Sequence, residues 1–200
     1  MVKKYSAEFW ELDSLLDSTQ YDQIGHCVAL LQNQLESFDE RNKTEHSASF
    51  ETLIQASFLI ATVAQMEHNL KKICDVIAEK RNLTIRTTDM KGANGFQSCI
   101  TFLGKVLQIP LPKMDLKVIR AVVDLRNGWV HNGGYLAKIP NNLGDLAKHV
   151  ELAPDGQIKI AAPFVQYACR LCQSFEGVVV GAINVGYAQL EEATRLNKRT

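Results

Sequence analysis

The chain has 200 residues, of which 46% are hydrophobic and 22% are charged, and its 22 basic and 22 acidic side chains cancel. A chain of this length buries enough apolar surface to fold as one domain without disulfides or metals. The neutral balance argues against a protein that coats duplex DNA, because such proteins carry a strongly basic surface, but it leaves room for a local basic cleft that binds short RNA.

The first half of the chain is predicted to be helical. Residues 6–40 form two short amphipathic helices broken near Ser18, and a charged loop follows over residues 39–46. Ser47 or Ser49 is the predicted N-cap of the next helix, which covers residues 50–81.

The helix over residues 50–81 carries a continuous apolar seam. Its apolar residues recur at alternating steps of four and three, as in coiled coils. These residues are Leu59, Val63, Met66, Leu70, Ile73 and Ile77. At 1.5 Å per residue the helix is roughly 45–50 Å long. A helix of that length either spans the domain or contributes to a dimer.

A polar loop over residues 82–95 separates this helix from a shorter one over residues 96–107. The shorter helix ends before Pro110 and Pro112, since the residue preceding a proline is pushed out of the helical region. Three basic residues lie in or beside the loop: Arg81, Arg86 and Lys91. They either form a basic lip that guides RNA phosphates or simply keep the surface charged.

The second half begins with an amphipathic helix over residues 114–131 that ends at two glycines, as expected of a glycine C-cap. Alternating residues on either side of Pro154-Asp155-Gly156 predict a β-hairpin, and Pro163 suits the first turn of a final helix. We therefore expect an all-α helical bundle with a small hairpin near residues 150–160, forming a single domain over residues 1–200.

The cysteines and the apolar segments indicate a compartment. The chain has five cysteines, an odd number, all in helical settings, which favours reduced thiols over a disulfide framework. They are Cys27, Cys74, Cys99, Cys169 and Cys172. No apolar run follows Met1-Val2-Lys3-Lys4-Tyr5, and the most apolar window, residues 177–185, is too short to span a bilayer. We expect a soluble, cytoplasmic protein with no membrane partner.

Common motifs for metal, nucleotide and serine chemistry are missing from the sequence. The histidines are scattered, and the Cys169–Cys172 pair lies inside a helix on its core stripe without a partner pair, which favours a structural role. There is no glycine-rich phosphate loop and no Gly-x-Ser-x-Gly elbow. We therefore expect no cofactor and no metal site.

The helix over residues 114–131 carries the residues most suited to chemistry. One of its faces is polar, and it is formed by Arg120, Asp124, Asn127 and His131. Asn127 and His131 are neighbours on this face, because positions four apart stack along a helix. Arg126 is offset by about 140° from His131 and lies in an apolar stripe. Its guanidinium there needs a carboxylate, a phosphate or a partner chain to satisfy its charge.

These residue types fit RNA cleavage. A histidine changes charge near neutral pH, so it can take a proton from an RNA 2′-hydroxyl or give one to the leaving 5′-oxygen. An arginine can stabilise the charge that develops on the phosphorane. The plain alternative is structural: a histidine near a helix C-terminus often only caps it, and an arginine on a mixed face often only forms a salt bridge.

Residues 124–134, Asp-Leu-Arg-Asn-Gly-Trp-Val-His-Asn-Gly-Gly, resemble the signature of the HEPN superfamily. That signature has an Arg, a polar residue and, about four to six positions later, a His, within a helical bundle. Arg126, Asn127 and His131 match these positions. The match covers about ten residues, and the order of long helix, loop, motif helix and closing helix agrees with it. Gly128 and the hairpin around Pro154 depart from the pattern.

The resemblance implies a homodimer in which the motifs of two subunits face one another across a cleft. It also implies a metal-independent endoribonuclease of a toxin–antitoxin or antiviral defence system that leaves a 2′,3′-cyclic phosphate. His131 would be general acid or base, Arg126 would stabilise the phosphate, and Asn127 would orient one of them. Family members often add a polar residue from an earlier helix, and Glu67 is the candidate here.

A second hypothesis belongs to another class. Other HEPN-like proteins keep the bundle without activity, and this chain would then be a non-catalytic module that binds a partner protein such as an antitoxin or a defence effector. That hypothesis places function on the Leu59–Ile77 seam rather than at His131.

Overall fold

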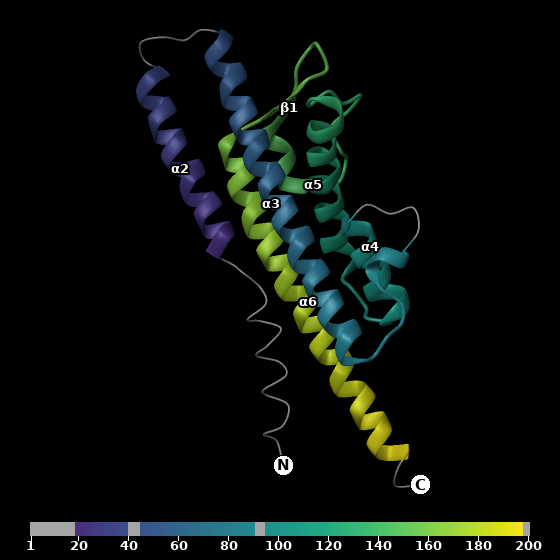
Figure 1. Cartoon of the computed structure of the whole chain (residues 1–200). Coiled ribbons are helices and arrows are strands. Elements are labelled where there is room, and N and C mark those ends of the chain that lie inside the picture. The colour runs from purple at the N-terminus through teal and green to yellow at the C-terminus, as the bar shows by residue number, and fades with distance from the viewer. Residues whose placement is uncertain (1–18, 40–44, 91–94, 198–200) are drawn as a thin grey trace. The chain divides into compact units, whose positions relative to one another are not determined.

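A computed structural model describes residues 19–39, 45–90 and 95–197 of the chain. These residues are mostly helical, and the strands among them form one two-stranded antiparallel sheet, so the predicted all-α fold with a small hairpin is confirmed (Figure 1). None of the described helices is long and apolar enough to cross a membrane.

The chain divides into two compact units that share the two longest helices, α3 (Glu45–Lys80) and α6 (Ala162–Asn197). The motif unit comprises the described residues 19–39, 45–66 and 113–173. The α4 unit comprises the described residues 67–90, 95–112 and 174–197. The expectation of a single domain over residues 1–200 stays a prediction.

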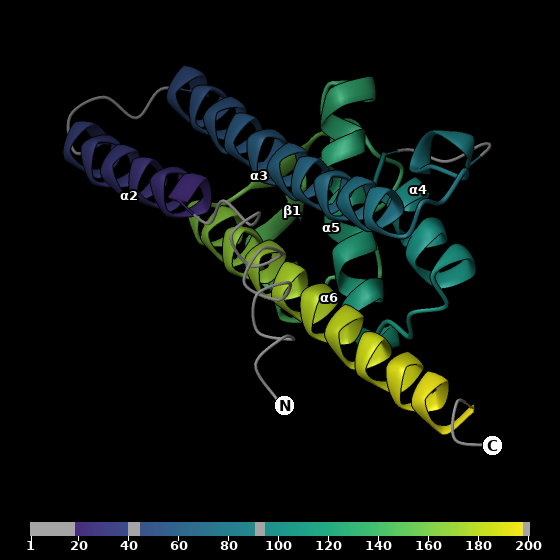
Figure 2. The ribbon, with the colours of Figure 1, turned by 60° about the horizontal axis from the view of Figure 1, so that its bottom comes forward.

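The motif unit is built around the first part of α3, α5 (Lys113–Asn132) and the first part of α6. Helix α2 (Thr19–Asp39) lies beside α3 in both views (Figures 1 and 2). The core of the unit consists of side chains with no exposed surface, among them Val28, Leu59, Val63, Val122, Leu125 and Phe164. Within this core the Thr62 hydroxyl and the Cys169 thiol share a hydrogen bond of 3.2 Å, which joins α3 to α6.

The predicted hairpin is present and is tied to the end of α5. Strands β1 (Val150–Leu152) and β2 (Ile158–Ile160) pair with Glu151 opposite Lys159. The turn between them uses Gly156 at φ 86, a left-handed conformation that glycine adopts without strain. The chain that follows α5 then pairs with the hairpin, through Ile158 N donating to Gly134 O at 2.9 Å and Leu136 N donating to Gly156 O at 3.2 Å. The hairpin therefore fixes the position of the backbone that follows α5.

The α4 unit packs α4 (Gly95–Thr101) and a π-helical turn, η2 (Phe102–Val106), with the second parts of α3 and α6. Within this unit the buried Asn69 Nδ2 donates to both carboxylate oxygens of Glu176 at 3.1 and 3.2 Å. The rings of Phe96 and Phe175 lie beside one another with centroids 6.1 Å apart. Helix α4 is thus attached to α6 by an aromatic contact.

Several predicted boundaries differ from the structure. Helix α3 begins at Glu45, so Ser47 and Ser49 lie inside it, and the prediction that one of them is the N-cap is wrong. The predicted loop contains a short 3₁₀ turn, η1 (Thr87–Asp89), and the predicted helix 96–107 is divided into α4 and η2. The first of the two helices predicted over residues 6–40 lies outside the described residues.

The apolar seam of α3 is buried within this one chain. Its six residues, from Leu59 to Ile77, are at most 1% exposed. The seam is therefore part of the core of each unit, and it offers no exposed surface to a partner protein or a second subunit. A partner would have to use another surface.

Candidate active site at the end of helix α5

Helix α5 is amphipathic, as its sequence predicts. Val122 and Leu125 have no exposed surface and Trp129 is 7% exposed, so one face lies in the core of the motif unit. On the opposite face His131 is exposed and Asn127 is half-buried. The structure therefore places the candidate acid–base residue at the surface, in the last turn of α5.

The end of α5 is shaped by two glycines. Gly133 has φ 61 and Gly134 has φ 87, both left-handed, so the helix ends directly after His131 and Asn132. A Cβ on Gly134 would lie 2.7 Å from two ring atoms of Trp129, because the backbone passes directly over the indole. Gly134 N donates to Gly128 O at 3.1 Å and closes the turn. These contacts fix where His131 leaves the helix.

Gly128, the unusual residue within the motif, has a packing role. A Cβ at this position would lie 2.8 Å from Cδ2 and 2.9 Å from Cγ of Leu136. The Leu136 side chain therefore rests on the bare backbone of α5, next to the hairpin that holds its backbone. The glycine weakens the helix but allows the following segment to fold back against the motif.

Arg126 lies in the apolar stripe of α5 that the sequence predicts. Its side chain is half-buried, and its Nε and Nη2 atoms are buried. Its stripe includes the buried Ile119 and Val123, whereas Val130 is 47% exposed. Two of the three guanidinium nitrogens therefore lie within the apolar stripe. A helical offset of about 140° separates Arg126 from His131.

The structure gives Glu67 a partner of its own. Glu67 belongs to the α4 unit, whereas the motif residues belong to the motif unit. Its Oε1 accepts a hydrogen bond from Phe96 N at 3.2 Å, at the start of α4, and its carboxylate lies beside Gly95. A carboxylate at this position stabilises the free N–H groups of the helix. Its catalytic role stays a prediction.

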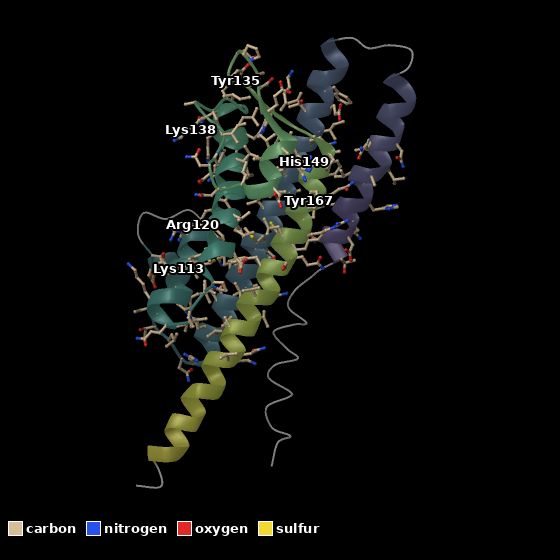
Figure 3. The ribbon with its side chains drawn as sticks, turned by 180° about the vertical axis from the view of Figure 1, so that it is seen from behind. Lys113, Arg120, Tyr135, Lys138, His149 and Tyr167 are labelled. Atoms are coloured by element: carbon tan, nitrogen blue, oxygen red, sulfur yellow. The ribbon has the colours of Figure 1, made fainter. Side chains whose placement is uncertain are left out.

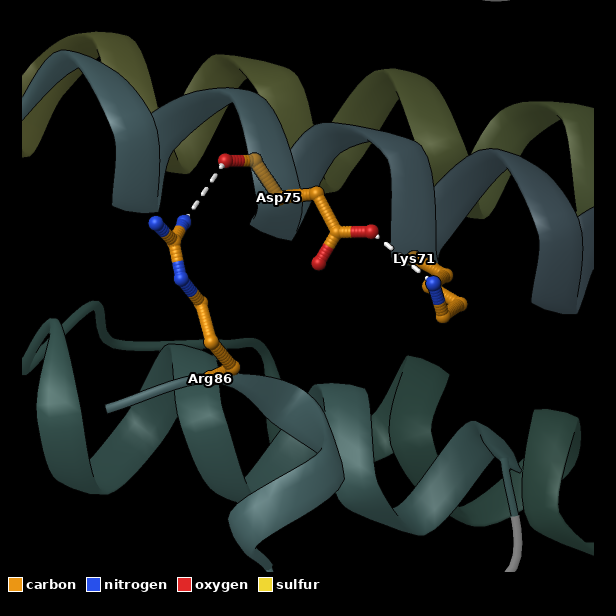
Figure 4. A network of polar contacts seen from close by, with 3 residues as sticks. All are labelled: Lys71, Asp75 and Arg86. Carbon is orange, nitrogen blue, oxygen red and sulfur yellow. Dashed lines mark hydrogen bonds and ion pairs between the residues drawn. The ribbon is translucent and has the colours of Figure 1, made fainter. Parts of the chain in front are cut away.

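Arg86, one of the three residues of the predicted basic lip, contacts α3. Arg86 Nη1 donates to the Asp75 carbonyl at 3.5 Å, and Asp75 forms an ion pair of 2.9 Å with Lys71 (Figure 4). The hydrogen bond to the Asp75 carboxylate raises the pKa of Lys71 above its ordinary value. Arg86 is thus directed at α3, and Lys91 lies outside the described residues.

Two features of the motif unit were not predicted from the sequence. His149 and Tyr167 stack with ring centroids 5.6 Å apart and an interplanar angle of 20°, and His149 Nε2 is buried without a hydrogen bond to a described residue. Lys113 and Lys117 lie on the same helix face as Arg120 and are exposed. No sequence pattern predicts that His149 stacks on Tyr167, but the spacing of the two lysines and Arg120 does predict that they share a helix face.

The five cysteines all lie in the described chain and none forms a disulfide, and four of them are buried. Burial raises the pKa of Cys169. In the α4 unit, a hydrogen bond between the Cys74 and Cys99 thiols raises the pKa of Cys74 and lowers that of Cys99. Among the described residues, no group of three or more His, Cys, Asp or Glu side chains is arranged to hold a metal ion.

Comparison with protein-family models, curated proteins and solved structures finds no match for this chain.

Proposed function

We propose that the protein is a metal-independent endoribonuclease of HEPN type that acts in a toxin–antitoxin or antiviral defence system. The observation that carries the proposal is the position of the Arg126-Asn127-x-x-x-His131 sequence in the last turns of α5, with His131 exposed where the helix ends. The order of long α3, loop, motif helix α5 and closing helix α6 supports it.

In the proposed reaction an RNA 2′-hydroxyl gives its proton to the imidazole of His131, and the 2′-oxygen attacks the adjacent phosphorus. The bond from phosphorus to the 5′-oxygen breaks, and that oxygen takes up a proton from an acid. The products are a 2′,3′-cyclic phosphate and a 5′-hydroxyl. Asn127, on the same face as His131, orients the imidazole or the phosphate.

One histidine cannot be base and acid at once on opposite sides of the phosphorus. A homodimer that brings two copies of α5 together supplies both, with one His131 as base and the partner subunit's His131 as acid. In this scheme the half-buried Arg126 stabilises the charge that develops on the phosphorane, the role that the resemblance implies for it.

The test is cleavage of RNA by the purified full chain with EDTA present. His131→Ala and Asn127→Ala are expected to lower the cleavage rate by at least about a hundredfold, as loss of a general acid or base does. His26→Ala is the matched control, because His26 is also exposed and lies on α2. Equal rates for His131→Ala, His26→Ala and the unchanged protein would refute the proposal.

A second candidate function, a non-catalytic module that binds a partner protein, is favoured by one observation. Phe50 and Leu53 are 59% and 54% exposed at neighbouring positions on the first part of α3. Exposed apolar residues one turn apart are typical of a helix that contacts a partner. Growth of cells that express the chain separates the two functions, because a ribonuclease arrests growth only while His131 is present.

A further inference from the structure

The exposed face of α5 carries a row of cations that leads to His131. Lys113, Lys117 and Arg120 are all exposed and follow at spacings of four and three residues. Such spacings stack side chains along one face of a helix, and the same stripe continues through Asn127 to His131. We call the three cations the α5 track.

The α5 track has little opposing charge. None of its three side chains has an ion pair or a side-chain hydrogen bond to another described residue. Asp124 is the one exposed carboxylate on α5, and it lies between the track and His131. A row of exposed cations without ion pairs attracts a polyanion, and the single carboxylate at Asp124 offsets only part of that attraction.

An exposed aromatic side chain lies beyond the other end of the motif. Tyr135 is 50% exposed, four residues after His131. Its backbone is held by a β-bridge to Gln157 of the hairpin loop. Figure 3 shows Lys113, Arg120 and Tyr135 following one another along one edge. A fixed, exposed ring is the platform on which an unpaired base stacks.

We propose that the α5 track binds the phosphates of a single-stranded RNA and that Tyr135 stacks one of its bases, so that the strand crosses His131 between them. This inference rests on the proposed function, because it takes His131 as the point of cleavage. It adds the substrate class, a single strand of several nucleotides, and the residues that select it.

Helix geometry sets the length of RNA that the surface holds. From Lys113 to His131 the helix rises roughly 27 Å at 1.5 Å per residue. A stacked strand advances about 3.4 Å per nucleotide, so about eight nucleotides reach from one end of the stripe to the other. Affinity is therefore expected to rise with RNA length up to about eight to ten nucleotides and then to level off.

Binding is measured by fluorescence anisotropy with a labelled twelve-nucleotide RNA of mixed sequence, in the His131→Ala background so that the RNA stays intact. The test protein also carries Lys113→Gln, Lys117→Gln and Arg120→Gln. The matched control carries Lys105→Gln, Lys159→Gln and Arg170→Gln, which remove the same residue types from exposed positions on η2, β2 and α6.

The track variant is expected to bind RNA at least about tenfold more weakly. The slope of log K against log salt concentration is expected to become shallower by about two, since each of the three phosphate contacts on a single strand contributes about 0.7 to that slope. The control is expected to retain its affinity. Tyr135→Ala is expected to weaken binding several-fold and Tyr135→Phe to restore it, because stacking needs the ring and not the hydroxyl. Equal losses in track and control variants would overturn the inference, as would equally tight binding of a duplex.

Cleavage by the native chain separates this inference from the proposed function. Track-dependent binding without any cleavage would refute the ribonuclease and leave the binding surface standing. His131-dependent cleavage that the track variant performs at the native rate, at RNA concentrations below saturation, would refute the track and leave the ribonuclease standing. Circular dichroism of every variant establishes that each one folds.

Discussion

Replacing Gly128 with alanine is expected to destabilise the protein, although alanine is the better helix former. The substitution gains about 1 kcal/mol of helix propensity. It also places a Cβ 2.8 Å from Cδ2 and 2.9 Å from Cγ of Leu136. Overpacking of this kind typically costs about 1–3 kcal/mol. To relieve the overlap, the Leu136 side chain must change rotamer or its backbone must shift, and the backbone is held by Leu136 N, which donates to Gly156 O at 3.2 Å. We expect a net loss of about 1 kcal/mol.

Gly181 provides the matched control. It lies within α6, is exposed, and a Cβ there would meet nothing within 4 Å. Gly181→Ala therefore gains helix propensity without a clash and is expected to stabilise the protein by about 0.5–1 kcal/mol. In a chain of this size about 1 kcal/mol moves Tm by about 2–4 °C. The two variants should shift Tm in opposite directions.

A double-mutant cycle tests the cause. In the Leu136→Ala background the overlap is gone, so Gly128→Ala is expected to stabilise by about 0.5–1 kcal/mol, which gives a coupling of about 1–3 kcal/mol. The assay is urea unfolding followed by circular dichroism. If Gly128→Ala stabilises the native sequence as much as Gly181→Ala does, Leu136 does not rest on the helix and the reasoning is refuted.

Three further predictions concern the packing. Gly134→Ala is expected to lower stability by more than about 2 kcal/mol, because a left-handed conformation strains alanine and the new Cβ meets an indole ring; a thermal shift below 2 °C would contradict this. Titration of the folded protein with a thiol reagent should modify Cys27 first, since the other four cysteines are buried and should react only on unfolding. Asn69→Ala is expected to cost about 1–3 kcal/mol in urea unfolding, because it removes a donor from the buried Glu176 carboxylate, whereas Glu176→Gln keeps an acceptor and should cost less.

The parts of the fold that were predictable have local signals. The face of α5 that contains Val122 and Leu125 follows from helical spacing alone, and the hairpin follows from alternation around Pro154-Asp155-Gly156. The α3 seam was also recognised, but its spacing left open what covers it. Spacing identifies an apolar face, and only the packed structure tells whether the same chain or a partner covers it.

The features that the sequence did not reveal depend on contacts between distant residues. The burial of the Arg126 guanidinium nitrogens depends on the segments that pack around α5, and the geometry of one helix does not describe them. Glu67 meets the start of α4 across 29 residues of sequence, and no motif marks that contact. The sequence shows Gly128 only as a residue that weakens the helix, because its packing partner, Leu136, lies beyond the glycine turn.

The most direct test of the central claim uses two RNAs that differ at one atom. A defined cleavage site is first mapped in an all-ribose strand, and the second strand carries a 2′-deoxy sugar on the 5′ side of that site. We predict that the full chain, with EDTA present, cuts the first strand to a 2′,3′-cyclic phosphate and leaves the second intact. Cleavage of both strands at the same rate, unchanged by His131→Ala, would contradict the account.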